Sequence, residues 1–262
     1  MGGSSKNEAM DLVSRRRVVS VGLCGVAVVV LRPAMGSTEA SESGHQPILD
    51  VPRLAEDPTA VPVRVSVDHP MDPDHFIESL DLILEADPVP RKGTFRFTPA
   101  SGRARLAFPM RSGSGGLLKA IATCNRHGRF VGTREIRVGG DGCATESDGP
   151  RARPGNPRIR VVGTPKRGEV VEVAVKLDHE SDTGLRLEDG KYTRVRPEYF
   201  VREMQVFLGN QRISDFRLTS ALSSNAILRL PVRVPGASTL RVVVVNSEGR
   251  RWDATEPIRV DA

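Results

Sequence analysis

Cysteine and histidine are the residues of this 262-residue chain whose types and positions best suit chemistry. Cys143 follows Gly139, Gly140, Asp141 and Gly142 in polar surroundings. Glycines leave a backbone flexible, and a thiolate needs exposure to react. The pattern therefore predicts that Cys143 is an exposed, reactive thiol at the end of a mobile, glycine-rich segment.

Cys124 has a different setting. It ends the segment 118–124, in which every second residue (Leu118, Ala120, Ala122 and Cys124) falls on one apolar face of an expected strand. A cysteine on such a face usually packs as a small apolar side chain. We therefore expect Cys124 to be a buried thiol.

Two histidines, His69 and His75, lie in the segment 68–75, whose sequence is DHPMDPDH. Its three aspartates offer oxygen ligands, but the spacing matches no standard zinc or calcium loop. Its two prolines are typical of a solvated turn. The sequence therefore predicts no metal site at this segment, and it indicates no cofactor elsewhere.

The common enzyme signatures are absent from the chain, including the phosphate-binding loop, the nucleophile elbow and the paired-cysteine redox motif. A dyad of Cys143 with His127 is conceivable for a hydrolase, but no oxyanion loop or helix N-terminus accompanies it. His179 follows a strand and is expected to be a loop residue. Catalysis is therefore the weaker interpretation, and a protein that is not an enzyme is favoured.

The N-terminal residues have the pattern of an export signal. Arg15, Arg16 and Arg17 precede an uncharged apolar run over 18–31, and Ala34-Met35-Gly36 follows it. The run is too short to span a bilayer and fits a secretory signal of the twin-arginine type. We expect residues 1–36 to be cleaved, residues 37–47 to form a flexible tether, and the mature protein to be periplasmic.

Cleavage also changes the charge and the number of cysteines. The chain has 38 basic and 32 acidic residues, a net charge of +6, and the signal removes five positive and two negative charges. The remaining charge, about +3, is too small to indicate nucleic acid as a partner. No other run could span a membrane. Two cysteines remain, so a Cys124–Cys143 disulfide is an alternative to two free thiols.

The expected elements are strands. Short segments with period-two alternation fill two blocks, 48–143 and 158–262, separated by the linker 144–157, which is rich in proline, glycine and charge. Abundant valine and frequent turn residues favour pleated structure. The sequence therefore predicts an all-β protein with two immunoglobulin-like β-sandwich domains.

The first block resembles the Y subunit of the Sox sulfur-carrier pair, and the second block resembles its Z subunit. The segments that carry the first resemblance are 52–57 (PRLAED), 61–63 (VPV), 87–90 (DPVP), 129–130 (RF) and 138–143 (VGGDGC). Those that carry the second are 157–161 (PRIRV), 167–173 (RGEVVEV), His179 with 183–186 (TGLR), 221–225 (ALSSN) and 246–249 (NSEG). They occur in order over nearly all of 48–262.

The resemblance implies a periplasmic carrier without catalytic activity, in which the Y-like and Z-like halves pair. It implies that Cys143 covalently holds sulfur intermediates of thiosulfate oxidation, with Gly139, Gly140, Asp141 and Gly142 as its arm. The family's arm is Gly-Gly-Cys-Gly-Gly at the chain's end, whereas here Asp141-Gly142 is inserted, Ala144 follows, and the chain continues.

The implied partners are Sox-type periplasmic enzymes or a quinoprotein dehydrogenase system, because fused carriers of this kind also resemble those associated with quinoprotein dehydrogenases. Two alternatives stay open at this point. One is a structural or adhesive β-sandwich protein with a Cys124–Cys143 disulfide. The other is a redox accessory of a quinoprotein dehydrogenase.

Overall fold

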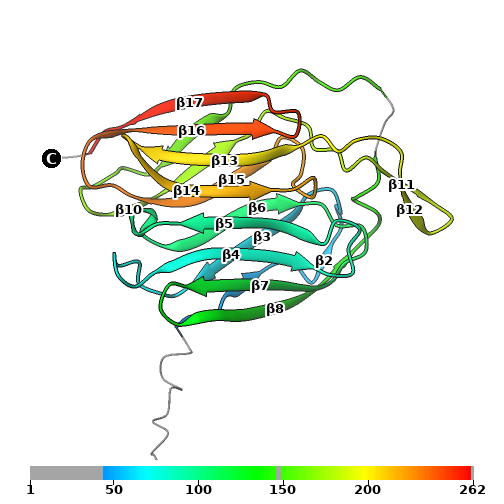
Figure 1. The fold of residues 1–262 in the computed structure, drawn as a ribbon, viewed down its shortest axis with the longest axis horizontal. Helices are drawn as coiled ribbons and strands as arrows, with labels where there is room; N and C mark the ends of the chain where they lie inside the picture. Colours follow the sequence, from blue (N-terminus) through cyan, green and yellow to red (C-terminus); the bar gives the residue numbers. More distant parts are fainter. Residues whose placement is uncertain (1–43, 146–148, 261–262) are drawn as a thin grey trace, which may run out of the picture. The chain divides into compact units, whose positions relative to one another are not determined.

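The computed structural model describes residues 44–145 and 149–260, which belong to one compact unit (Figure 1). The predicted export signal and residues 37–43 of the predicted tether lie outside the described residues. Within the described ranges, no helix combines the length and the apolar character needed to cross a membrane.

Strands make up most of the described structure. The first block forms β1 (Ile48–Asp50), β2 (Leu54–Ala55), β3 (Val61–Val67), β4 (Ile77–Leu84), β5 (Arg91–Phe97), the short 3-10 helix η1 (Pro99–Ser101), β6 (Ala104–Met110), β7 (Gly116–Cys124) and β8 (Gly128–Val138). The second block forms β9 (Arg158–Val162), β10 (Val170–Lys176), β11 (Leu185–Glu188), β12 (Lys191–Arg194), β13 (Val201–Leu208), β14 (Gln211–Leu218), β15 (Ile227–Arg233), β16 (Ser238–Asn246) and β17 (Arg251–Ile258).

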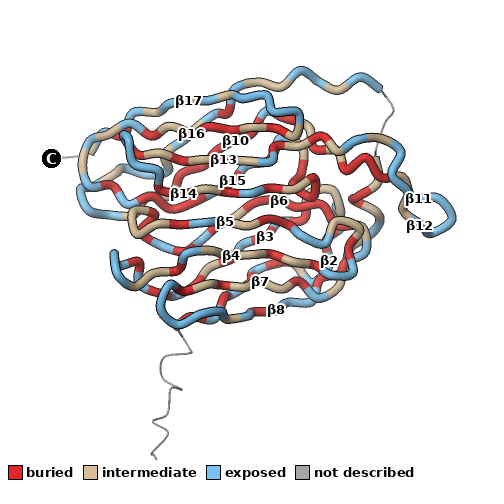
Figure 2. The backbone as a smooth tube through the Cα atoms, in the orientation of Figure 1, coloured by how far each residue is buried: buried red, intermediate tan, exposed pale blue. Residues whose placement is uncertain are grey.

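The period-two alternation is the reason that these segments are strands, and the expected all-β fold is confirmed. In β3 the four valines are buried while the residues between them are exposed or half-buried. In β7 the same alternation buries Leu118, Ala120, Ala122 and Cys124. Figure 2 shows buried and exposed residues alternating along the strands. These two strands therefore have one face in the core and one toward solvent.

The strands form two large sheets, and both sheets contain strands of both blocks. The nine-stranded sheet has the order β17-β16-β13-β14-β5-β4-β7-β8-β2, and the six-stranded sheet has the order β1-β3-β6-β15-β10-β9. A separate hairpin joins β11 and β12. The two sandwich halves are thus joined edge to edge.

The seam between the halves is a regular antiparallel ladder of β5 with β14, from the Phe97–Ser214 pair to the Gly93–Leu218 pair. Behind the ladder, Phe216 packs against Phe95 with ring centroids 5.2 Å apart. Buried residues from both halves belong to a single hydrophobic cluster. The pairing of Y-like and Z-like halves is therefore a shared core and not only a covalent tether.

The predicted tether ends earlier than expected. Residues 44–47 were assigned to a flexible segment, but His45 is only 4% exposed. The Gln46 side chain donates a hydrogen bond to the Val131 carbonyl of β8 at 3.3 Å. Gly132 of β8 allows this segment to pass, because a Cβ atom there would lie 2.0 Å from the Pro47 carbonyl oxygen. Residues 44–47 are therefore part of the fold.

Candidate functional site

Cys143 is fully buried, so the prediction of an exposed thiol is wrong for this conformation. Its Sγ donates a hydrogen bond to Asp87 Oδ1 at 3.3 Å. Its carbonyl oxygen accepts a hydrogen bond from the Thr183 hydroxyl, which comes from the second half. Cys143 therefore bonds to both halves, through its thiol to the first and through its backbone carbonyl to the second.

The glycine-rich segment before Cys143 is held by specific hydrogen bonds. The Gly142 amide donates to the Ser112 carbonyl at 3.0 Å, and the Gly142 carbonyl accepts from the Arg111 guanidinium at 3.1 Å. Asp141 Oδ1 accepts bonds from the Cys143 amide at 2.8 Å and from the Tyr192 hydroxyl at 2.7 Å. These hydrogen bonds hold the segment in place, although its glycines predicted a mobile segment.

An ion pair without solvent exposure lies under Cys143. Lys92 Nζ is 2.7 Å from Asp87 Oδ1, and both side chains are 0% exposed. Asp87 also accepts hydrogen bonds from Ser112 Oγ and the Gly113 amide, each at 2.8 Å. Burial raises the pKa of Asp87, but the charge of Lys92 and the hydrogen bonds from Lys92 and Ser112 outweigh burial, so this pKa lies below its ordinary value.

The same environment keeps the Cys143 thiol protonated. Burial, followed by the negative charge of Asp87, raises the pKa of Cys143 to about 12. A thiol is a poor nucleophile until it loses its proton. In this conformation the fraction of Cys143 that is a thiolate at neutral pH is therefore small.

The structure contradicts a Cys124–Cys143 disulfide, because both residues are free, buried cysteines. Cys124 ends β7, whereas the Cys143 segment is bonded to Ser112, just before β7 begins at Gly116. Eight residue steps of a strand separate these points by about 26 Å, and a disulfide requires Cα atoms within about 7 Å.

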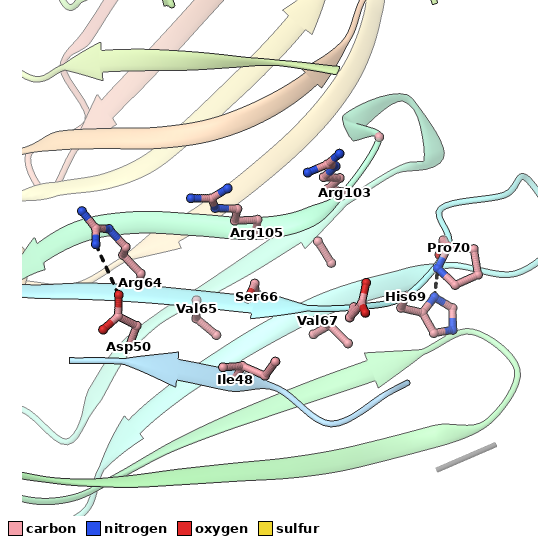
Figure 3. Close-up of a pocket in the computed structure, with 13 residues that line it drawn as sticks. Ile48, Asp50, Arg64, Val65, Ser66, Val67, His69, Pro70, Arg103 and Arg105 are labelled. Atoms are coloured by element: carbon pink, nitrogen blue, oxygen red, sulfur yellow. Dashed lines mark hydrogen bonds and ion pairs between the residues drawn. The ribbon is translucent and has the colours of Figure 1, made fainter. Parts of the chain in front are cut away.

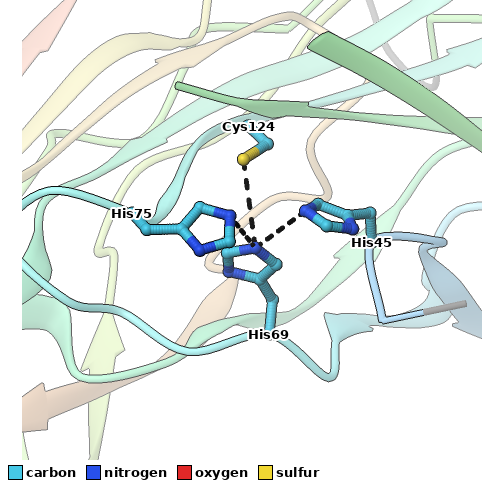
Figure 4. Close-up of side chains that lie close together, drawn as sticks. All are labelled: His45, His69, His75 and Cys124. Carbon is cyan, nitrogen blue, oxygen red and sulfur yellow. Dashed lines mark hydrogen bonds between the residues drawn. The ribbon is translucent and has the colours of Figure 1, made fainter. Parts of the chain in front are cut away.

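Cys124 lies instead beside a group of four histidines, of which Figure 4 shows three. The ring nitrogens form a closed circuit of 3.0 Å contacts, in the order His69 Nε2, His45 Nε2, His127 Nδ1 and His75 Nε2. Cys124 Sγ is 3.9 Å from His69 Nε2 and 3.8 Å from His127 Nδ1. We call these five residues the His/Cys cluster.

Three loops at one end of the first half position the cluster. His45 comes from the segment that crosses β8 at Gly132, and its ring stacks on Phe130. His69 and His75 flank a turn closed by paired backbone hydrogen bonds between Asp72 and His75. Cys124 and His127 flank the β7–β8 turn.

The β7–β8 turn is fixed to the His75 loop. The Asn125 side chain accepts a hydrogen bond from the Phe76 amide at 2.9 Å and donates one to the Asp74 carbonyl at 3.0 Å. The Arg126 guanidinium donates to the same carbonyl at 2.7 Å. Side chains from distant parts of the sequence are thereby held in one geometry.

Hydrogen bonds and burial act on several donor atoms of the cluster. His69 Nδ1 bonds to the Pro70 carbonyl at 2.5 Å, so Nδ1 carries the proton and the Nε2 lone pair points into the cluster. The Arg126 amide donates to Cys124 Sγ at 3.5 Å. Burial, then the neighbouring imidazoles, lower the pKa of His75, and burial is also the main influence that lowers the pKa of His69.

The cluster corrects three sequence-based expectations. Segment 68–75 is a largely exposed turn, as expected, but its histidines are not solvated: His69 is 9% exposed and His75 is half-buried. His127 lies with Cys124 and not with Cys143, so the hydrolase dyad is excluded. The packing role predicted for Cys124 gives its burial correctly but misses its imidazole neighbours. His179 is in a loop, as expected, beside Asn246.

One sequence feature could have indicated the cluster. Four of the five histidines lie before the linker, and Cys124 precedes His127 by three residues. Cysteine and histidine at that spacing on a tight turn can bind one ion. The donors do not form a contiguous metal-binding loop, because His45, His69 and His75 lie in other loops than Cys124 and His127.

A wide groove lies beside β3 and β6 in the first half (Figure 3). Arg64, Arg103 and Arg105 line it, and Arg64 pairs with Asp50 at 3.3 Å. Arg64 is two-thirds exposed, so this ion pair contributes little to stability. The groove contains neither cysteine.

Family comparisons agree with this architecture. Residues 32–143 match the family described as sulfur oxidation protein SoxY, and residues 159–257 match sulphur oxidation protein SoxZ. A comparison with curated proteins finds no match.

Several solved structures are similar to parts of the chain. A superoxide reductase (neelaredoxin) from Ignicoccus hospitalis is 29% identical over 39% of this chain and 88% of its own, with a TM-score of 0.35. A putative superoxide reductase from Thermotoga maritima is 20% identical over 36% of this chain and 86% of its own, with a TM-score of 0.32. Murine CEACAM1b is 15% identical over 82% of this chain and 99% of its own, with a TM-score of 0.24.

The fold and the family matches define a two-part all-β carrier component of sulfur oxidation, in which both parts share two sheets. Within that class, the chain belongs to the SoxY and SoxZ families as a fused SoxY–SoxZ-type protein. Cys143 is the last residue of the SoxY match.

Proposed function

We propose that this protein is a periplasmic carrier that covalently holds sulfur intermediates on Cys143 and presents them to partner enzymes. The observation that carries the proposal is the position of Cys143 at the end of the SoxY-type half, in a segment held by hydrogen bonds. Such bonds contribute only about 1 kcal/mol each to stability, so they can open reversibly.

The carrier has two states in this proposal. In the closed state, which the structure describes, Cys143 is protonated against Asp87 and cannot react. In the open state the segment leaves Ser112 and Arg111, and the thiol reaches solvent and a partner's active site. Opening removes the two influences that raise the pKa of Cys143, namely burial and Asp87, so it also activates the nucleophile.

The contacts of the Cys143 segment with the second half support a role for the SoxZ-type half. Tyr192 bonds to Asp141, and Thr183 bonds to the Cys143 carbonyl, so residues of the second half hold the arm closed. A partner that binds the second half can therefore release the arm. We propose Sox-type enzymes or a quinoprotein dehydrogenase system as partners, and export by the N-terminal signal.

The test is intact-mass analysis with peptide mapping of protein purified from the periplasm of a thiosulfate-oxidising host. The expected result is sulfur or sulfur-oxyanion adducts on Cys143 that a reductant removes and that Cys143→Ser abolishes. A matched control is the double variant Cys143→Ser/Ser114→Cys, because Ser114 is an exposed neighbour in the first half. Equal adducts on this new cysteine would indicate general thiol chemistry and refute the proposal, as would wild-type protein without adducts.

A further inference from the structure

The His/Cys cluster has a geometry that hydrogen bonds alone do not explain. Each of its four ring nitrogens has two others at 3.0 Å. A neutral imidazole nitrogen either donates one proton or offers one lone pair. Four such atoms can therefore form at most two good hydrogen bonds among four contacts. A central cation satisfies all four lone pairs at once.

The dimensions fit one metal ion. A square with 3.0 Å edges has its corners about 2.1 Å from its centre, which equals the usual metal–imidazole bond of about 2.0–2.1 Å. His69 and His127 occupy opposite corners, and the sulfur is almost equally far from both. The sulfur therefore lies on one side of the nitrogen square, near its axis.

The sulfur completes a five-atom donor set. Its contacts of 3.8 and 3.9 Å place it about 3.2 Å from the centre of the square. An ion drawn about 0.7 Å toward it would have bonds of about 2.2 Å to nitrogen and 2.5 Å to sulfur, near the usual 2.0–2.1 and 2.3 Å. All five residues can thus bind one ion with small adjustments.

The donor set selects among metals. Calcium and magnesium take oxygen ligands, and zinc takes four ligands in a tetrahedron. Blue-copper sites use two histidines and one cysteine in a trigonal plane. Four nitrogens in a square with an axial thiolate match the donor pattern of thiolate-ligated haem iron, with imidazoles in place of the macrocycle.

We propose that His45, His69, His75, His127 and Cys124 bind a single iron ion in square-pyramidal geometry. Supporting hydrogen bonds orient the ligands: His69 Nδ1–H to Pro70, and the Arg126 amide to Cys124 Sγ. The site is separate from Cys143 and does not depend on the carrier role.

Within the described residues no aspartate or glutamate joins this group of donors, so the sixth position, opposite the sulfur, is open to an external ligand. The chain has five histidines, and the fifth, His179, bonds to Asn246 in the other half. Cys124 is buried, whereas His127 is exposed, so the side away from the sulfur faces outward. The ligand class that suits an open position on iron is a small anion, and azide is the probe.

The test uses the full chain loaded anaerobically with ferrous iron and then oxidised with ferricyanide, which accepts one electron per iron. The expected results are one iron per chain, a visible thiolate-to-iron(III) charge-transfer band, and a shift of that band on addition of azide. Ascorbate, which returns the electron, should abolish the band.

Three variants make the result specific. Cys124→Ser should abolish the band, and His127→Ala, at an exposed ligand, should weaken iron affinity at least about tenfold by chelator competition. Gly132→Ala keeps all five donors but forces the His45 segment away from β8, so it should also weaken binding. The control is Asp72→Asn, an exposed neighbour that is not a ligand.

The proposal fails if no stoichiometric iron binds, if only zinc binds, or if Cys124→Ser and His127→Ala bind iron as tightly as the wild type. An unchanged absorption spectrum with azide refutes the open position. Circular dichroism of each variant separates loss of a ligand from loss of fold.

Discussion

The closed arm can be opened by adding one methyl group at Gly142. A Cβ atom there would lie 1.9 Å from the Pro58 carbonyl oxygen and 2.8 Å from the Ser112 carbonyl oxygen. Both neighbours are backbone atoms in a packed region, so the arm must move and not its surroundings. In Gly142→Ala we therefore expect three hydrogen bonds to be lost. They are the bond from the residue-142 amide to the Ser112 carbonyl, the bond from Arg111 to the residue-142 carbonyl, and the bond from the Cys143 thiol to Asp87.

The size of the effect follows from these three bonds. At about 1 kcal/mol each, their loss shifts the closed–open equilibrium by about 2–3 kcal/mol, which corresponds to about 30- to 160-fold more open arm. Labelling of a protected thiol follows the open population when opening is fast. The rate of Cys143 labelling, measured by thiol reagent and peptide mapping at neutral pH, should rise by the same factor.

The matched control is Gly140→Ala. A Cβ atom at Gly140 meets only Pro58 Cγ at 3.8 Å, an ordinary contact, so the labelling rate should stay within about threefold of wild type. If Cys143 is labelled in Gly142→Ala at the same rate as in the wild type, the idea that a closed arm protects the thiol is refuted. So would equal acceleration by Gly140→Ala, because general loosening of the segment would then explain both.

Three further predictions concern the thiol and the seam between halves. Burial and Asp87 raise the pKa of Cys143 to about 12, from an ordinary thiol pKa of 9.0. The closed arm therefore has its full stability below pH 9.0 and loses stability as the pH rises from 9.0 toward 12. The rate of Cys143 labelling in the wild type should therefore keep rising toward pH 12, and a rate that becomes constant near pH 9 would contradict this. Phe216→Ala should lower the free energy of unfolding by about 3–5 kcal/mol in urea denaturation, since Phe216 is fully buried against Phe95; a loss below about 1 kcal/mol would argue against a shared core. Proteolysis within 149–157 should leave the halves together in size exclusion because of the β5–β14 ladder, and separate elution would disprove the pairing.

The alternation along the chain determined much of the fold. Valines at every second position of β3 and the apolar face of β7 define strands without reference to tertiary structure, because side chains alternate sides on a pleated backbone. β14 was harder to predict, because Ile213 and Ser214 are buried in succession and interrupt its alternation. The ordered SoxY-like and SoxZ-like segments also fixed the family.

Local sequence could not determine the environment of Cys143. Its glycines and acidic neighbour predict mobility and exposure, since they have no apolar side chains to bury. The structure buries the thiol instead, because the Gly142 backbone fits against Pro58 and Ser112 and Tyr192 reaches Asp141 from the other half. These partners are distant in sequence, so composition around Cys143 contains no information about them.

The sequence by itself determined the residue types, the strand alternation and the two-block order, because these depend on near neighbours along the chain. Only the tertiary structure decided that one sheet continues from β5 to β14 and the other from β6 to β15. It also decided that His45, His69, His75, His127 and Cys124 meet at one point. The physical reason is that strand edges and clustered side chains are matched in space. Loop closure brings the four histidines and Cys124 from three separate loops into contact, and local periodicity along the sequence does not encode contacts between distant loops.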